Sequence, residues 1–318
     1  MQTTAPEAVI FGDLHLSALP PSCRRQEPNW FEAMAKQIKE LTEIANGAPV
    51  LCAGDVFDRW TPPHELLTFA MDVLPPNFWA IPGQHDMAYH RYQDLHKTAF
   101  GVLQKAGRIK NIQETELTIN GNPVIGVPWG AEIAVCNTGG EAPIVVAHKY
   151  VWSNNQNRHE NADEQGNWAN VKKSLRPGTL AVFGDNHTPF SSIQLDWNEP
   201  VIQNTKSGPV GFGMGSFFRR QKPDKDLIPR VLVVDRALRG KLKFHLQDLK
   251  TPKTDIFVEE EESVAGAIDT SRIEAFVGSL HSLSATVFDF RQRLLQAADA
   301  LENDAAANLL RKAAHDAA

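Results

Sequence analysis

Short apolar runs alternate with stretches of helical spacing through residues 8–106, and this alternation constrains the fold more than any other feature. The runs, each followed closely by a glycine, are 8–11, 49–53 and 78–81. Unbroken apolar runs of this length are typical of strands buried on both faces. The predicted helices are 30–45, 64–73 and about 92–106. This order predicts an α/β fold with a mixed or parallel sheet flanked by helices.

Strands dominate the chain from about residue 115 onward. The predicted strands are 116–119, 123–127, 143–147, 179–183, 231–234 and 242–246. Between them, the polar stretch 149–173 is predicted to be a long surface loop with room for one short helix. Loops of that length usually serve function or move.

Five short segments place Asp, Gln or His directly after a predicted strand. They are Gly12-Asp-Leu-His15, Gly54-Asp-Val-Phe-Asp-Arg59, Gly83-Gln-His-Asp86, Ala147-His-Lys149 and Gly184-Asp-Asn-His187. Ligands of open α/β sheets bind outside the carboxyl ends of the strands, so these segments are expected to converge. Carboxylates and imidazoles together suit manganese, iron or zinc, and one carboxylate can bridge two ions. The sequence therefore predicts a metal centre at this edge.

These segments resemble, in order, the motif series of the calcineurin-type metallophosphoesterases: D-x-H, G-D-x-x-D-R, G-N-H-D/E, a lone His and G-H-x-H. The resemblance covers residues 12–187, about half of the chain. It implies a four-layer α-β-β-α sandwich that holds two divalent ions close together, at the spacing usual for two-metal sites.

The resemblance also implies a role for individual residues. Seven metal ligands are implied: Asp13, His15 and His187 for the first ion, Asp55 as the bridge, and Gln84, His148 and Asp185 for the second ion. His85 would protonate or stabilise the leaving group. Asp58 and Arg59 would orient the ligands and His85.

The sequence departs from the family pattern at two implied ligands of the second ion. Gln84 stands where the family has Asn, and Asp185 replaces the first His of G-H-x-H. Both changes supply oxygen atoms, which favours manganese or magnesium over zinc. Two divalent ions, manganese first, are therefore expected, with magnesium, iron or zinc as the other candidates. A degraded second site that holds no metal is the alternative.

One branch of the superfamily is similar beyond the metal motifs. The stretch Gly213-Met-Gly-Ser-Phe-Phe-Arg-Arg220, followed by the strand 230–235, resembles SbcD-type DNA repair nucleases, including phage-type ones. This resemblance implies a manganese-dependent exonuclease or endonuclease acting on single- or double-stranded DNA. It also implies an SMC-like ATPase as a partner. Only residues 256–318 follow the catalytic region, so the capping domain of that branch must be reduced or absent.

The charge of the chain is unevenly distributed. The net charge is −6, yet residues 206–253 hold twelve Lys or Arg against four Asp. This window could follow a nucleic-acid backbone, or it could be a set of solvated strand edges. The overall acidity suits a phosphomonoesterase or cyclic-nucleotide phosphodiesterase acting on a small molecule. An inactive metal-binding scaffold is the third possibility that the altered Gln84 and Asp185 leave open.

The C-terminal region carries its own pattern. A run of four acids, Glu259 to Glu262, divides a catalytic domain, 1–255, from a linker and helical region, 256–318. Apolar residues from Ile273 to Leu301 follow a 3-4 spacing over four heptads. This seam is expected either to fold back on the chain's own helices or domain, or to pair with a partner or a second copy.

Other features exclude several classes of protein. The three scattered cysteines give no disulfide framework and fit a reducing compartment. No apolar stretch approaches the length of a membrane helix, and no secretory signal pattern begins the sequence. A cytoplasmic protein without membrane contact is expected.

Overall fold

The computed structural model describes residues 5–133, 140–160, 162–194, 200–204, 207–238 and 241–250, together with Ala298. Contacts divide the chain into two units, 1–259 and 260–318, and every described residue except Ala298 belongs to the first. The predicted boundary after residue 255 and the apolar seam from Ile273 to Leu301 lie outside the described residues.

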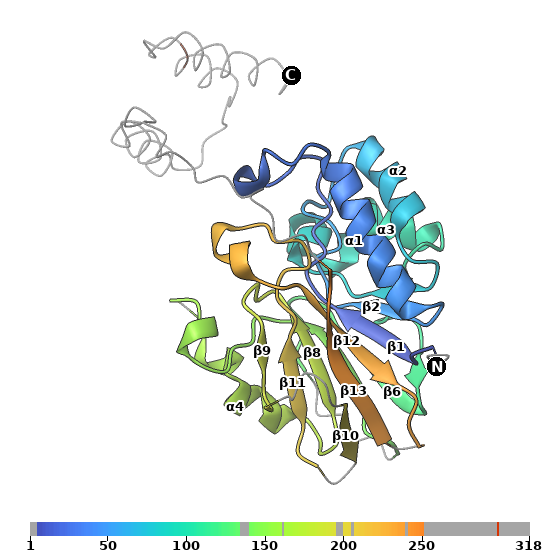
Figure 1. The fold of residues 1–318 in the computed structure, drawn as a ribbon, viewed down its shortest axis with the longest axis vertical. Coiled ribbons are helices and arrows are strands. Elements are labelled where there is room, and N and C mark those ends of the chain that lie inside the picture. The colour runs from blue at the N-terminus through green and yellow to red at the C-terminus, as the bar shows by residue number, and fades with distance from the viewer. Residues whose placement is uncertain are drawn as a thin grey trace, which may run out of the picture. The chain divides into compact units, whose positions relative to one another are not determined.

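One sheet of the first unit has seven strands (Figure 1). They are β1 (Ala8–Phe11), β2 (Val50–Cys52), β3 (Phe78–Ala80), β4 (Lys110–Asn111), β10 (Val201–Asn204), β12 (Arg230–Asp235) and β13 (Lys241–Asp248). Their order is β10-β13-β12-β1-β2-β3-β4. Strands β1 to β4 run parallel, whereas β12 pairs antiparallel with β1. The carboxyl ends of β1, β2 and β3 therefore share one edge.

The second sheet has six strands. They are β5 (Thr118–Ile119), β6 (Asn122–Val127), β7 (Ile144–His148), β8 (Leu180–Gly184), β9 (Phe190–Ser191) and β11 (Val210–Gly213). Their order is β5-β6-β7-β8-β11-β9, and the central four, β6-β7-β8-β11, are parallel. The carboxyl ends of β7 and β8 consequently also share an edge.

In the described part of the first unit, four α-helices accompany the sheets: α1 (Trp30–Ala45), α2 (His64–Val73), α3 (Ala99–Lys105) and α4 (Trp168–Val171). Short 3-10 helices lie at Ser22–Arg24, Gln84–Asp86, Ala88–His90, Tyr92–Lys97, Asn155–Asn157, Glu164–Gly166, Lys172–Ser174 and Lys222–Asp226. The Asn29 side chain caps α1 by accepting from the Glu32 amide, and Asn46 ends it in the left-handed conformation. Among the described helices, none has the length and apolar character that crossing a bilayer requires.

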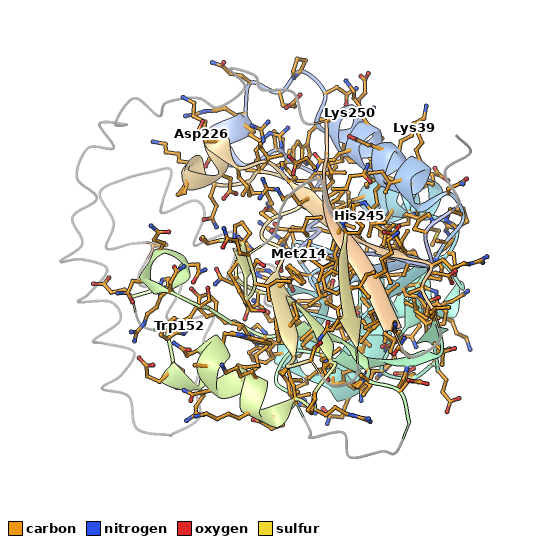
Figure 2. All side chains as sticks on the ribbon, turned by 60° about the horizontal axis from the view of Figure 1, so that its bottom comes forward. Lys39, Trp152, Met214, Asp226, His245 and Lys250 are labelled. Atoms are coloured by element: carbon orange, nitrogen blue, oxygen red, sulfur yellow. The ribbon has the colours of Figure 1, made fainter. Side chains whose placement is uncertain are left out.

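Alternating strand residues divide the core into three apolar layers. In β1, Phe11 packs in the cluster formed with α1 and α2, whereas Ile10 faces the other sheet. In β7, Val146 joins the layer between the sheets, and Val145 packs with Trp168 of α4. Met214, labelled in Figure 2, also belongs to the layer between the sheets. The arrangement is helices, sheet, sheet and helix (Figure 1), which confirms the expected four-layer α-β-β-α sandwich.

Two elements differ in detail from what the sequence predicted. The helical stretch expected at about 92–106 is present, but it is divided at Thr98 into a 3-10 helix and α3, and the Thr98 hydroxyl donates to Leu95 O and accepts from the Gly101 amide. Residues 210–213, for which no strand was predicted, form β11. Glycines fit there because a Cβ at Gly211 or Gly213 would collide with the rings of Trp168 or Phe190.

Candidate metal centre

The five predicted segments meet where the carboxyl ends of the two sheets approach each other. A Cβ on Gly12, after β1, would lie 3.4 Å from Cα of Gly184, at the end of β8. The Asp185 amide donates a hydrogen bond of 2.9 Å to Oδ1 of Asp13. The junction of the sheets thus brings together side chains that stand 172 positions apart in the chain.

The backbone is strained at four of the implied ligands. Asp13, His15, Asp55 and Asp185 have φ values of 51°, 46°, 50° and 78°. Side-chain-bearing residues rarely occupy this left-handed region, and such strain gathers at functional sites. The loops after β1, β2 and β8 therefore direct these side chains towards one point, and the backbone strain is the conformational cost.

The residues implied for the first ion lie together. One donor atom from each of Asp13, His15 and His187 lies within 4.8 Å of the others. Nε2 of His15 is 3.2 Å from Nε2 of His187 and 3.5 Å from Oδ2 of Asp55. Two imidazole nitrogens that face each other beside carboxylates form a donor set that suits a divalent cation.

The residues implied for the second ion also lie together. The Gln84 side chain donates to Oδ1 of Asp185 at 2.9 Å, and its Oε1 lies 2.7 Å from Nε2 of His148. The other ring nitrogen of His148 donates to the carbonyl of Ala53 at 2.6 Å. This contact leaves Nε2 as the nitrogen that can ligate a metal.

Asp55 lies between the two groups. Its Oδ2 is 3.5 Å from Nε2 of His15 and 3.4 Å from Nε2 of His148. Its Oδ1 accepts a hydrogen bond from the His85 amide. One carboxylate oxygen facing both groups is the placement that a bridging ligand needs, although its role as the bridge stays a prediction.

The electrostatics of the cluster favour bound cations. Burial raises the pKa of Asp13 to about 8. Burial alone would lower the pKa of His148, but the carboxylates of Asp55 and Asp13 raise it to about 10. Among the described residues, the buried Oδ2 of Asp13 has no hydrogen-bond partner. Without a metal the cluster therefore holds protons that divalent ions would replace, so the residues present fit a dinuclear centre.

His85 differs from the buried ligands in its exposure. Its side chain is 43% exposed, and Nε2 lies 4.0 Å from Oδ2 of Asp55. Nδ1 lies 2.9 Å from the carbonyl of Asp58, so that carbonyl orients the ring and leaves Nε2 facing the centre. His85 also belongs, with His15 and Asp55, to a group that could hold an ion. The geometry suits a proton donor and equally permits a ligand.

Asp58 is held by an arginine that sequence reasoning did not place in the site. Arg220 donates to Oδ1 of Asp58 at 2.7 Å and to the carbonyl of His15 at 3.0 Å. Arg59, predicted for the orienting role, is exposed and makes no hydrogen bond or ion pair within the described part of the chain. Arg220 lies in the stretch 213–220, which resembles the SbcD-type nucleases. This resemblance was the sequence feature that could have pointed to Arg220 as a site residue.

Asp86 holds two of the site loops together. Its buried carboxylate accepts hydrogen bonds from the backbone amides of Val56, Phe57 and Gly83. Burial and the nearby Asp55 raise the pKa of Asp86 to about 7. No role was predicted for Asp86 from the sequence, and in the structure it fixes the turns that follow β2 and β3.

Gly54 is required where the turn after β2 meets His148. It has a φ of +97°, and a Cβ at this position would collide with the imidazole of His148. We expect Gly54→Ala to lower the free energy of unfolding by about 3 kcal/mol, because backbone strain adds to overpacking. Gly47→Ala is the matched control, since Gly47 has a φ of +86° and open space around it. Thermal melts that show equal losses for both variants would contradict the steric argument.

Two cavities differ in their relation to the metal centre. A cavity of about 290 Å³ is bordered by His148 and Asp185 together with Trp129, Lys149 and Tyr150. It therefore opens directly onto the implied second ion.

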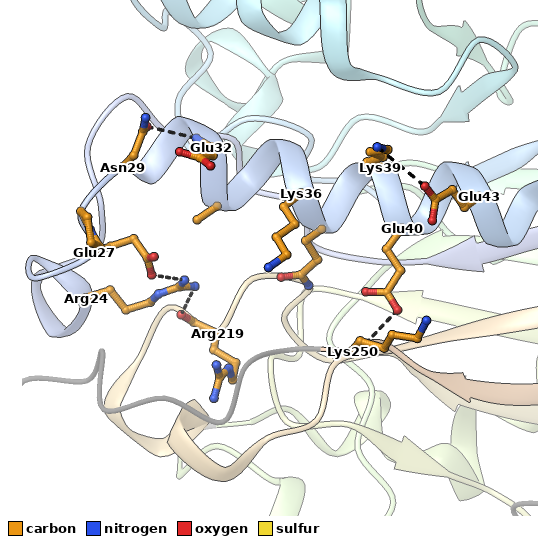
Figure 3. A pocket seen from close by; sticks show the side chains of 13 residues that line it. Arg24, Glu27, Asn29, Glu32, Lys36, Lys39, Glu40, Glu43, Arg219 and Lys250 are labelled. Atoms are coloured by element: carbon orange, nitrogen blue, oxygen red, sulfur yellow. Dashed lines mark hydrogen bonds and ion pairs between the residues drawn. The ribbon is translucent and has the colours of Figure 1, made fainter.

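A larger cavity of about 530 Å³ lies against α1 and contains no implied ligand (Figure 3). Several of its charges are satisfied internally. Arg24 pairs with Glu27 at 2.7 Å, Lys39 with Glu43 at 4.0 Å, and the Lys250 amide donates to Glu40. This cavity is not part of the candidate site.

Comparison with known families agrees with the geometry. A family model described as calcineurin-like phosphoesterase matches residues 8–224. The chain is similar to a metallophosphoesterase from Sphaerobacter thermophilus at 13% identity and a TM-score of 0.39, covering 78% of this chain and 90% of that one. It is similar to a 5'-nucleotidase precursor from Thermus thermophilus at 15% identity and a TM-score of 0.40, covering 76% of this chain and 54% of that one. No curated protein matches.

The family match spans well over half of the 318 residues and includes every segment that lines the cluster. The chain belongs to the calcineurin-like phosphoesterases, hydrolases that cleave phosphoesters at a dinuclear metal centre.

Proposed function

We propose that this phosphoesterase is a manganese-dependent DNA nuclease of the SbcD type. The observation that carries the proposal is a set of cations next to site residues on three separate loops. Arg59 follows Asp58, Lys149 follows His148 and lines the smaller cavity, and Lys222 follows Gln221, whose side chain lies 3.3 Å from Nδ1 of His187. Positive charge on several sides of a phosphoesterase centre suits a polyanionic backbone better than a single phosphate.

The rest of the basic window supports the proposal only in part. Arg230 pairs with Asp248 at 2.6 Å, and Arg236 pairs with Glu7 at 2.8 Å. These two arginines agree with the alternative interpretation of the basic window, in which its charges are solvated side chains on strand edges. Arg220 is likewise paired, with Asp58 at 2.7 Å, whereas Lys222 and Lys225 are exposed in the segment that follows it. The proposed DNA contacts are therefore these two lysines with Arg59 and Lys149.

In the proposed reaction the side chains position the phosphodiester and supply a proton. Divalent ions, when bound by the cluster, neutralise charge that develops on the phosphoryl group. Water adds to phosphorus, and the bond to the leaving oxygen breaks as that oxygen takes the Nε2 proton of His85. Because Nδ1 of His85 already donates to the Asp58 carbonyl, His85 acts in its doubly protonated form and is left as the Nδ1–H neutral imidazole. Arg220 keeps Asp58 in place through its contact of 2.7 Å.

Manganese is the proposed ion because Gln84 and Asp185 contribute oxygen atoms to the second group. Asp185→His is expected to shift the activity ranking from manganese towards zinc, by about 10- to 100-fold in relative activity. The measurement is the rate in manganese, magnesium, cobalt and zinc. Asp163→His is the matched control, because Asp163 lines the same cavity without contacting an implied ligand. An unchanged ranking in Asp185→His would show that this carboxylate does not touch the ion.

A phosphomonoesterase or cyclic-nucleotide phosphodiesterase acting on a small molecule is the second candidate. The 290 Å³ cavity beside His148 favours it because its volume suits a small ligand. Hydrolysis assays with manganese on single-stranded DNA, double-stranded DNA, bis(p-nitrophenyl) phosphate and p-nitrophenyl phosphate separate the candidates. Cleavage of DNA supports the nuclease. Hydrolysis confined to the small esters supports the second candidate, and hydrolysis of none of the four overturns both.

A further inference from the structure

Four aromatic side chains gather in two pairs beside the metal centre. The ring centroids of Trp60 and Tyr89 are 5.6 Å apart, and those of His90 and Trp129 are 5.2 Å apart. Tyr89 and His90 are neighbours in the chain, so one backbone segment carries a member of each pair. We call these four residues the aromatic shelf.

The shelf is tied to the loops that carry the site. Trp60 lies two residues after Asp58, whose carbonyl orients His85. Tyr89 and His90 end the segment that begins with Gln84 and His85. The amide of Trp129 donates to the carbonyl of Pro82 at 3.2 Å, directly before that segment. A molecule on the shelf is therefore held at a fixed position relative to His85.

Trp129 links the shelf to the implied second ion. It lines the 290 Å³ cavity together with His148, Asp185 and Lys149. On the other side of the shelf, the exposed Arg59 directly precedes Trp60. Aromatic faces with cations beside them are the combination by which proteins hold single-stranded nucleic acid, since bases stack while phosphates meet positive charge.

The backbone presents Tyr89 and His90 at a cost. Tyr89 has a φ of 54° and His90 a φ of 57°, which is unusual for tyrosine in particular. The Tyr89 side chain is nevertheless 73% exposed, so burial of its ring within the described chain does not offset this strain. Strain that displays a large aromatic ring to solvent beside a reaction centre indicates a ligand with an aromatic face.

We propose that the aromatic shelf stacks an unpaired nucleobase next to the phosphodiester that is cleaved. The proposal rests on the proposed function, and it narrows the substrate to single-stranded DNA or to strand ends with unpaired bases. A base that remains paired in a duplex has its faces covered by neighbouring bases and cannot enter the shelf.

Binding of two oligonucleotides of equal charge tests the proposal. The full-length protein is titrated against a labelled thymidine decamer and against an abasic decamer with the same phosphates, in EDTA so that cleavage does not occur. We expect the thymidine decamer to bind about tenfold or more tightly, the scale of stacking on aromatic residues. We expect Tyr89→Ala to remove most of this difference and Tyr89→Phe to keep it.

Leu238→Ala is the matched control, because Leu238 is also 73% exposed but lies in the turn after β12. It should leave the preference for bases intact. Trp60→Leu is a second variant that tests the shelf from another loop and should also weaken the preference. Melting curves establish that each variant is folded.

Equal affinity of the wild type for both decamers overturns the shelf, as does a base preference that survives in both Tyr89→Ala and Trp60→Leu. Hydrolysis of bis(p-nitrophenyl) phosphate tests the proposed function separately, because this ester carries no base. If the protein hydrolyses this ester but binds both decamers equally, the proposal of the aromatic shelf is wrong and phosphodiester hydrolysis stands. If the protein prefers the thymidine decamer but hydrolyses no phosphodiester, the aromatic shelf stands and the proposed function is wrong.

Discussion

Replacement of Asp55 by Asn is expected to lower the rate of phosphodiester hydrolysis by about 10³-fold or more, beyond the usual cost of losing one electrostatic stabiliser. The reason is that Oδ2 of Asp55 faces both His15 and His148, at 3.5 and 3.4 Å. The amide oxygen of Asn carries no formal charge. Both ions would therefore lose a negatively charged ligand that offsets their positive charge. Metal analysis of the purified protein should show reduced content at both sites.

Thermal melts give a second measurement of the same variant. Manganese at a hundredfold excess over its Kd should stabilise the wild type by about 2.7 kcal/mol, since it binds only the folded cluster. That corresponds to a rise in Tm of about 5–10 °C for a domain of this size. Asp55→Asn should lose most of this rise, whereas Asp72→Asn, at an exposed position of α2, should retain it. Wild-type metal content in Asp55→Asn would defeat the assignment of the bridge.

His85→Asn is expected to keep both ions and to lose about 10²- to 10⁴-fold in rate, the usual scale for a general acid. The exposed ring points Nε2 at the centre because the Asp58 carbonyl holds Nδ1 at 2.9 Å. The loss should be larger for DNA than for bis(p-nitrophenyl) phosphate, because nitrophenolate leaves readily without a proton. Rates on both substrates, with metal analysis, measure the effect.

His96→Asn is the control for this variant. His96 is exposed, and its Nδ1 also contacts a backbone carbonyl, that of Gln93 at 3.1 Å, but it lies outside the candidate metal groups of the described residues. Its replacement should change neither the rate nor the metal content. Loss of an ion from His85→Asn would assign His85 as a ligand with His15 and Asp55, and the role of acid would then fall.

The residues alone predicted the first helix and the strand ends that carry the candidate centre, whereas the four layers were implied by the family resemblance. The expected range of α1, 30–45, is the observed one, and Asp13, Asp55 and Asp185 follow β1, β2 and β8 as expected. The physical reason is that these signals are local. A strand buried on both faces needs an unbroken apolar run, and a residue directly after a parallel strand must lie at the carboxyl edge of the sheet.

The residues that support the centre from distant parts of the chain became visible only in the folded structure. Arg220 reaches Asp58 across 162 positions, and the Ala53 carbonyl fixes the ring of His148 across 95. Arg59, adjacent to Asp58 in sequence, is exposed and makes no ion pair with Asp58 in the described part of the chain. Such contacts depend on how the turn after β2 is placed against the end of β7 and against the segment between β11 and β12. Residue type and spacing within one segment carry no record of that placement. For the same reason, the pairing of His90 with Trp129 followed from the packing of the two sheets and not from any motif.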